Sequence, residues 1–328
     1  MNNKETLLEI QNLKKYFPIH GGIFSKKIGD VYAVDDVTLQ LKKGETLGIV
    51  GESGCGKSTL GKTIIKLYEP DSGKILFQNE DITNYNHSKM RKLRQNIQII
   101  FQDPFSSLNP RMTIQEILSE PFDIHKIFKN KKEKDQELKK LVSEVGLSED
   151  ALLRYPHEFS GGQRQRIGIA RAIALKPKLI VCDEPVSALD VSIQSQILNL
   201  LMDLRDKYHL SYIFIAHDLA VVEHISDHVA VMYLGQIVEY TTKKQLFQNP
   251  KHPYTKALLE SIPSLEKIGK KDLQVLSGEI PSPSNPPKGC RFHTRCPIAI
   301  DRCHSEVPQL LPKTNQGEKH LVRCLLVE

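Results

Sequence analysis

The chain has 328 residues, a length that favours about two domains over one. Apolar residues make up 40% and charged residues 26%, which are ordinary values for a globular protein and exclude a disordered or fibrous chain. The net charge of +6 is modest and does not by itself indicate a nucleic-acid partner. No run approaches the roughly 18 to 20 apolar residues that cross a bilayer, and the first residues lack the apolar core of a signal peptide. We therefore expect a cytosolic protein with reduced thiols.

The first predicted elements are two strands, over residues 7–17 and 31–41. Residues 7–17 alternate only loosely between apolar and polar, a pattern that we interpret as an edge strand. An aromatic ring near its end, Phe17 or its neighbour Tyr16, suits stacking on the adenine of a nucleotide, although a core aromatic fits the same pattern. We favour Phe17 for the stacking role.

A glycine-rich loop follows the apolar strand predicted over residues 46–50 and precedes a helical pattern. Strand, loop and helix in this order make a phosphate cradle, because the glycines let successive N–H groups turn towards a nucleotide's oxygens. Lys57 is then expected to reach the β- and γ-phosphates, rather than lie on the surface of an ordinary turn, and Ser58 to bind Mg²⁺. The glycine order differs from the G-x-G-x-x-G of dinucleotide binders. The residues predicted to bind a triphosphate are Gly51, Glu52, Ser53, Gly54, Cys55, Gly56, Lys57, Ser58 and Thr59.

Gln102 follows the strand predicted over residues 97–101, and helical patterns then dominate residues 110–155. Taken alone, a glutamine after a strand is more often a surface amide than a catalytic one. The lysines within residues 126–140 are interleaved with acids, which indicates a solvated helix face. Gly146 suits the end of that helix.

A second helix that could bind an anion at its start is predicted after residue 159. One phosphate loop needs no second γ-phosphate site on the same chain. The turn should therefore serve the nucleotide of another copy, unless it is a simple helix cap. Its residues are Ser160, Gly161, Gly162 and Gln163.

Two carboxylates end the apolar run over residues 179–182, which suits a strand buried on both faces. Asp183 suits Mg²⁺ coordination, and Glu184 suits polarising the attacking water as a general base. A later strand, over residues 211–216, ends at His217. A lone histidine is usually structural, but at the carboxyl edge of a parallel sheet it favours sensing of the γ-phosphate.

Four of the six cysteines lie in the last 39 residues, with the spacing C-x5-C-x6-C-x20-C. Four thiolates suit zinc or an iron–sulfur cluster, and the close cysteine pairs typical of structural zinc are absent. Four unligated cysteines are the simpler alternative, but a proline-rich tail of this length folds poorly without a staple. The cysteines are Cys290, Cys296, Cys303 and Cys324, and His293, His304 and His320 are alternative zinc ligands.

Taken together, residues 7–248 resemble an ABC-type ATPase. The resemblance implies an α/β fold, a P-loop NTPase of the ABC type with an antiparallel β subdomain and a helical subdomain inserted at about residues 104–165. We place the ATPase domain at residues 1–248 and a small cysteine-rich C-terminal region at 249–328. The motifs that carry the resemblance are the phosphate loop, Gln102, the turn at 160–163, Asp183, Glu184, the loop that ends at Asp190, and His217.

In that family, two ATPase subunits hold two ATP molecules, each between one phosphate loop and the partner's Ser-Gly-Gly-Gln turn. The resemblance implies that ATP-driven closure and hydrolysis power alternating access in membrane subunits that dock on the helical subdomain. It assigns catalysis to Glu184, His217 and Gln102, nucleotide contact also to Asp190, and Mg²⁺ ligation to Ser58, Gln102 and Asp183.

The tail narrows the resemblance, because residues 250–255 and 278–283 are similar to the tail of oligopeptide/dipeptide importer ATPases, closest to the F-type subunit. Relatives with this tail carry a [4Fe–4S] cluster, which favours that cluster over zinc. F-type subunits pair with a D-type ATPase, two permease subunits and an extracytoplasmic peptide-binding protein. The resemblance thus implies a heterodimer, with a homodimer as the alternative, lying peripherally on the cytoplasmic face of the cell membrane.

Three other functions remain open at this point. One is an importer ATPase for another solute, such as nickel or a glycoside. Another is a soluble ABC ATPase acting on nucleic acid or ribosomes, but the second ATPase unit or coiled-coil insertion usual there is missing from the sequence. The third is a metal-sensing regulatory protein. We expect no nucleic-acid partner.

Overall fold

A computed structural model describes residues 5–22, 25–261, 278–312 and 320–327. The first four residues, part of the segment in which we predicted no signal peptide, lie outside these ranges. The chain forms two compact units, one of residues 1–83 and 216–328, the other of residues 84–215. The predicted domain limits at residue 248 and at 104–165 stay predictions.

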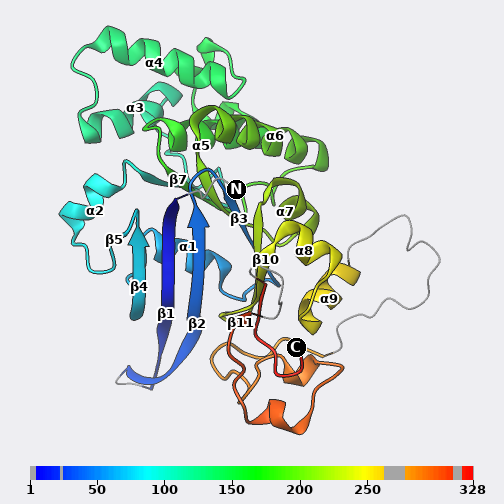
Figure 1. Ribbon diagram of the computed structural model, residues 1–328. Coiled ribbons are helices and arrows are strands. Elements are labelled where there is room, and N and C mark those ends of the chain that lie inside the picture. Colours follow the sequence, from blue (N-terminus) through cyan, green and yellow to red (C-terminus); the bar gives the residue numbers. More distant parts are fainter. Residues whose placement is uncertain (1–4, 23–24, 262–277, 313–319, 328) are drawn as a thin grey trace. The chain divides into compact units, whose positions relative to one another are not determined.

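The first unit contains an antiparallel sheet of four strands, which Figure 1 shows in blue and cyan. Strand β1 pairs with β2 along one side and with β4 along the other, so the prediction of an edge strand is wrong. Alternation reports which face is buried, here that of Leu8 and Ile10, but not how many neighbours a strand has. The strands are β1 Thr6–Gly21, β2 Lys26–Lys42, β4 Ser72–Phe77 and β5 Glu80–Asp81.

A second sheet of the first unit is built on β3, whose five residues are all buried, as their apolar sequence predicted. Strand β3 runs parallel to β9, and β9 forms a hairpin with β10 around Gly235. The last two strands, β11 and β12, extend the sheet beyond β10. The strands are β3 Thr46–Val50, β9 His228–Tyr233, β10 Gln236–Thr242, β11 Leu311–Pro312 and β12 Leu321–Val322.

Helices of the first unit begin at residues that cap them. The Asp218 carboxylate accepts a hydrogen bond from the N–H of Ala220 at the start of α7, and the Thr242 hydroxyl accepts one from Gln245 at the start of α8. Figure 1 shows α8 and α9 following β10 in yellow. The helices are α1 Lys57–Ile64, α7 Leu219–Ile225, α8 Lys243–Gln248 and α9 Pro253–Glu260, with short 3₁₀ turns η4 His293–Arg295 and η5 Asp301–His304.

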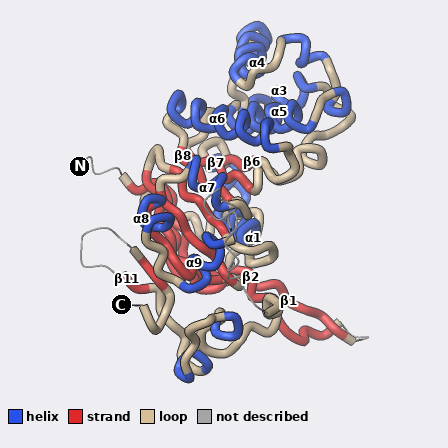
Figure 2. The backbone as a smooth tube through the Cα atoms, turned by 90° about the vertical axis from the view of Figure 1, so that its right-hand side faces the viewer, coloured by secondary structure: helices blue, strands red, loops and turns tan. Residues whose placement is uncertain are grey.

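The second unit combines three parallel strands with a group of helices. The strands, β6 Ile97–Ile100, β7 Leu179–Asp183 and β8 Ser211–Ile215, lie close to their predicted positions. Figure 2 shows α3, α4, α5 and α6 gathered together. The face of α4 that carries Leu138, Leu141 and Val142 is buried, and Gly146 just beyond the helix has a φ of 73°, which suits the end of a helix. The helices are α2 His87–Leu93, α3 Ile114–His125, α4 Lys131–Glu144, α5 Gly161–Ile173 and α6 Val191–Tyr208, with 3₁₀ turns η1 Glu149–Leu153 and η2 Pro156–Glu158.

None of the helices in the described part of the chain combines the length and the apolar character needed to cross a membrane.

Candidate nucleotide site

The phosphate loop connects β3 to α1 in a conformation that two of its positions can adopt only as glycine. Gly51 and Gly56 have φ values of 155° and 108°. A Cβ atom on Gly51 would lie 2.1 Å from the carbonyl oxygen of Met232, and one on Gly56 would lie 1.9 Å from that of Ala33. At these two glycines the loop is therefore packed directly against neighbouring backbone.

The helix that follows the loop starts without an acidic residue in its first turn. Its N-cap is Gly56, which has no side chain to cover the first N–H groups, so the positive end of the helix is left for an anion. The buried Lys57 donates hydrogen bonds from Nζ to the carbonyl oxygens of Gly51 and Glu52, at 2.8 and 3.0 Å. The ammonium group thus lies against the backbone of the loop. Ser58 is the next residue, in the first turn of α1.

His217 directly follows Ala216, which is hydrogen-bonded to β3, the strand that precedes the phosphate loop. The N–H of Ala216 donates a 3.1 Å hydrogen bond to the carbonyl oxygen of Ile49 in β3. His217 itself is exposed. A histidine exposed next to the end of β3 suits the γ-phosphate role better than a core role, and that role stays a prediction.

Phe17 and Tyr16, the two candidates for adenine stacking, differ in their surroundings. The Tyr16 hydroxyl donates to Asp35 Oδ1 at 2.5 Å, and its ring meets Tyr32 edge-on with centroids 4.8 Å apart. Phe17 is half-buried, with its ring edge-on to Tyr68 and Lys15 Nζ 5.4 Å from the ring centroid. Both rings therefore have contacts of their own, and the choice of Phe17 for adenine stacking stays a prediction.

In the second unit, Gln102 and Glu184 are joined by a hydrogen bond from Nε2 of the amide to Oε2 of the carboxylate, at 2.8 Å. Glu184 follows the buried Asp183 at the end of β7 and has a φ of 46°, a left-handed conformation that costs a non-glycine residue about 1 kcal/mol or more. The N–H of Glu184 donates to the carbonyl oxygen of Ile215, which holds this turn in place. Strained backbone at a strand end is typical of functional sites.

The turn at residues 160–163 forms a complete capping box at the start of α5. Ser160 Oγ accepts from the N–H of Gln163 at 3.4 Å, and Gln163 Oε1 accepts from the N–H of Ser160 at 3.0 Å. A Cβ on Gly162 would lie 2.6 Å from Ile193 Cγ2, so the turn packs closely on the next helix. Because Ser160 and Gly161 are exposed, this capped start remains open to an external anion.

Asp190 caps the neighbouring helix α6, since its Oδ1 accepts from the N–H of Ile193 at 2.9 Å. The carboxylate therefore has a structural role that the sequence did not indicate. Its predicted contact with nucleotide stays a prediction.

The four C-terminal cysteines lie in a compact region of the first unit. The N–H of Cys290 donates to the carbonyl oxygen of Cys303 at 2.9 Å. Burial, with a smaller contribution from the other three thiols, raises the pKa of Cys290 to about 11. Among the residues that the structure describes, no group of three or more His, Cys, Asp or Glu side chains is arranged to hold a metal ion. The predicted iron–sulfur site thus receives no support from the structure.

His320, one of the alternative zinc ligands, is engaged elsewhere. Its Nε2 lies 2.7 Å from Oε1 of Glu239, and both side chains are buried. This pair attaches the residue before β12 to β10. The sequence showed neither the pairing nor its purpose.

Two C-terminal residues that the sequence analysis missed contact the phosphate loop. Arg295 donates two hydrogen bonds to the Glu52 carboxylate, and the Tyr254 hydroxyl accepts one from the N–H of Glu52. In the sequence, Arg295 is notable only because it directly precedes Cys296. Nothing in the sequence links it to the phosphate loop.

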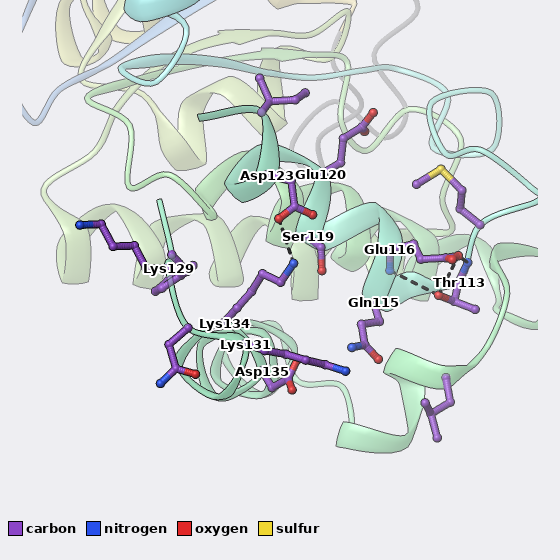
Figure 3. Close-up of a pocket in the computed structure, with 15 residues that line it drawn as sticks. Thr113, Gln115, Glu116, Ser119, Glu120, Asp123, Lys129, Lys131, Lys134 and Asp135 are labelled. Atoms are coloured by element: carbon purple, nitrogen blue, oxygen red, sulfur yellow. Dashed lines mark hydrogen bonds and ion pairs between the residues drawn. The ribbon is translucent and has the colours of Figure 1, made fainter. Parts of the chain in front are cut away.

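A separate pocket lies between α3 and α4 (Figure 3). Lys134 donates to Asp123 at 2.9 Å across it, and Glu116 closes the capping box with Thr113 at the start of α3. None of the predicted site residues lines this pocket. Its lining includes Glu116, Ser119, Glu120, Asp123, Phe128, Lys131, Lys134 and Asp135.

Two family models match the chain. The ABC transporter model matches residues 34–187, and the model for the oligopeptide/dipeptide transporter C-terminal region matches residues 238–303. The first spans the phosphate loop, the capped turn of α5 and the carboxylates that end β7. The second spans the segment that brings Tyr254 and Arg295 to the loop.

Similar proteins cover nearly the whole chain. The oligopeptide transport ATP-binding protein AppF of Bacillus subtilis is 56% identical, over 99% of this chain and 98% of its own. The oligopeptide transport ATP-binding protein OppF of Escherichia coli is 51% identical, over 99% and 97%. Among solved structures, the ATP-binding cassette MJ0796, as a dimer bound to ADP and Pi, is 25% identical with a TM-score of 0.64, covering 72% of this chain and 99% of its own. The cbiO1 protein of Clostridium perfringens is 27% identical with a TM-score of 0.63, covering 75% and 92%.

Proposed function

The chain belongs to the ABC transporter family, and we propose that it is the ATP-hydrolysing subunit of an importer of oligopeptides or dipeptides. The observation that carries the proposal is the full-length similarity to oligopeptide transport ATP-binding proteins, which includes the C-terminal region specific to that group. The phosphate loop supports it, since its geometry suits the oxygens of a nucleoside triphosphate.

ATP binding is assigned to the loop and its helix. Lys57 leaves the carbonyl oxygens of Gly51 and Glu52 and turns its ammonium group to the β- and γ-phosphates. The hydroxyl of Ser58 and the carboxylate of Asp183 are the oxygen ligands that suit Mg²⁺, with Gln102 as a further ligand. The bound ion neutralises charge on the transferring phosphoryl group.

Hydrolysis is assigned to Glu184, which accepts a proton from the attacking water as the water oxygen bonds to the γ-phosphorus. The bond between that phosphorus and the oxygen bridging to the β-phosphate breaks, and ADP leaves with the electron pair. Gln102 holds one carboxylate oxygen through its amide and thereby sets the direction in which the other oxygen points. His217 donates to the γ-phosphate, and Phe17 stacks on adenine. The loop that ends at Asp190 completes the nucleotide contacts.

The capped turn at residues 160–163 serves the ATP bound to a partner subunit. Its exposed Ser160 and Gly161 support this role, because the start of α5 is open to an anion from outside the unit. We propose that the partner is a D-type ATPase subunit. Two permease subunits and an extracytoplasmic peptide-binding protein complete the assembly, with this chain on the cytoplasmic face of the membrane.

The pocket between α3 and α4 is the proposed contact with the permease subunits. It lies in the helical part of the second unit, and its lysines and carboxylates can exchange their mutual ion pairs for those of a docking helix. Docking at this place would transmit ATP-driven movement to the transport pathway.

For the four cysteines we propose a [4Fe–4S] cluster, with zinc as the alternative, on the basis of the resemblance and of their spacing in the sequence. No step of hydrolysis depends on it. Anaerobic purification followed by iron, sulfide and zinc analysis decides the matter. Zinc without iron, or neither metal, contradicts the proposed cluster.

Transport in reconstituted membranes tests the main proposal. The complex with its permeases and binding protein, in proteoliposomes loaded with ATP, should accumulate labelled peptides, and the Lys57→Ala variant should not. Accumulation of nickel or a glycoside without peptide, or ATPase activity that responds only to nucleic acid, contradicts it.

A further inference from the structure

The C-terminal region reaches back to the phosphate loop through an ion pair between Arg295 and Glu52. The two guanidinium nitrogens Nη1 and Nη2 donate to Oε2 and Oε1 of Glu52, at 2.7 and 3.0 Å. The side chains are only 5% and 23% exposed, respectively. Two-pronged, charge-assisted hydrogen bonds shielded from water are both strong and directional. The second residue of the loop is thus held by a side chain 243 positions away.

A second contact holds the backbone of the same residue. The N–H of Glu52 donates to the Tyr254 hydroxyl at 2.9 Å. Tyr254 is completely buried, and its ring lies within a cluster with Tyr233 and Phe292 at centroid distances of 4.8 and 5.4 Å. The hydroxyl is therefore fixed in position, and so is the amide plane that it holds.

A third contact supports the loop from the hairpin turn between β9 and β10. The N–H of Gly235 donates to the carbonyl oxygen of Cys55 in the loop, at 2.8 Å. Arg291, four residues before Arg295, donates to the carbonyl oxygen of Leu234 and to Asp35. The segment over residues 291–295 thus contacts the phosphate loop through Arg295. Through Arg291 it also contacts the hairpin turn that donates a hydrogen bond to the loop.

Glu52 needs such a partner for an electrostatic reason. Its carboxylate is part of a loop that must receive the negative charges of a triphosphate, and like charges at short range repel. Arg295 neutralises the carboxylate and fixes its direction. Without Arg295, the partly buried carboxylate of Glu52 would lack this partner, would repel ATP and would change the conformation of the loop.

We propose that Arg295 is a positioning residue for ATP binding, which acts through Glu52 to keep the phosphate loop neutral and correctly shaped. The C-terminal region is then a working part of the nucleotide site. This inference rests on the proposed function, since it concerns the loop assigned to ATP.

The test compares MgATP affinity and turnover in purified full-length chain. Arg295→Gln should weaken ATP binding about tenfold, and kcat at saturating ATP should stay within about twofold, because Arg295 touches no reacting atom. In the Glu52→Gln background the same substitution should change the dissociation constant less than twofold, since no charge is left to neutralise. The matched control is Arg302→Gln, in the same region, whose partner Glu306 is on the surface.

Two outcomes overturn the inference. One is an affinity of Arg295→Gln equal to that of Arg302→Gln, and the other is an equal loss of affinity in the Glu52→Gln background. If Arg295→Gln does not fold, Arg295→Lys serves in its place, because it keeps the charge and loses the paired geometry, and a loss below threefold contradicts the proposal. If the wild-type chain binds ATP no better than Lys57→Ala, the proposed function fails instead.

Discussion

Glu184 and Gln102 share a 2.8 Å hydrogen bond at the carboxyl ends of two parallel strands, β7 and β6, which bring together residues 82 positions apart. A glutamine at position 184 retains an oxygen that can accept this bond, but it cannot accept a proton from water. Glu184→Gln should therefore lower the hydrolysis rate about 10²- to 10⁴-fold and leave ATP binding within about twofold. Rapid-quench hydrolysis and nucleotide titration measure the two quantities.

The control for that experiment is Glu149→Gln, which removes an exposed carboxylate of the same unit that pairs with Lys139. It should alter neither hydrolysis nor binding. Turnover by Glu184→Gln near the wild-type rate would remove Glu184 from the role of general base.

Ser160→Arg should damage the ATP site built on the partner's phosphate loop and spare its own. The substitution places a bulky cation at the exposed start of α5, where the partner's γ-phosphate is proposed to bind. Photolabelling of the purified complex with azido-ATP measures nucleotide binding on each subunit separately. The amount of label on the partner subunit should decrease, and the amount on the mutated subunit should not change. Asn86→Arg, at the capped start of α2 and outside the pocket between α3 and α4, is the matched control, since it loses a cap of similar worth, about 1 kcal/mol. Loss of label on the mutated subunit itself would contradict the assignment.

Gly56→Ala should destabilise the fold and abolish ATP binding. The new Cβ would lie 1.9 Å from the carbonyl oxygen of Ala33, at a φ of 108° that disfavours alanine. We expect a loss of roughly 2 to 4 kcal/mol in the free energy of unfolding, measured by urea titration. Gly168→Ala, in helix α5 with nothing within 4 Å of the new atom, should instead gain about 0.5 to 1 kcal/mol. Equal behaviour of the two variants would show that the loop tolerates a side chain.

Stability should fall as the pH is lowered from about 6.5 to about 4, because of His252. Burial lowers the pKa of its side chain from 6.5 to about 4, although the charge of Glu239 opposes the shift. Between these pH values the unfolded chain binds a proton at His252 that the folded chain does not bind. The free energy of unfolding therefore decreases as the pH falls. The full loss is about 3 kcal/mol, and below pH 4 this contribution changes no further.

The comparison variant for the pH series is His252→Asn, which keeps an acceptor for the N–H of Tyr254 and removes the titrating ring. Its unfolding free energy, followed by urea titration at each pH, should decline less steeply over this interval. A slope identical to that of the wild-type chain would exclude His252 as the source.

The sequence by itself determined the phosphate loop, the capped turn of α5 and the strands that end at Asp183 and Ile215. Each of these features is specified by residues close together in the sequence. A buried strand, a glycine-rich turn and a helix start can each be predicted from a run of about five to ten residues. The tertiary structure alone decided that β1 has a neighbour on both sides, that His320 pairs with Glu239, and that Arg295 holds Glu52. An arginine carries no local signal for its partner, because which acid it meets depends on how the whole chain folds back.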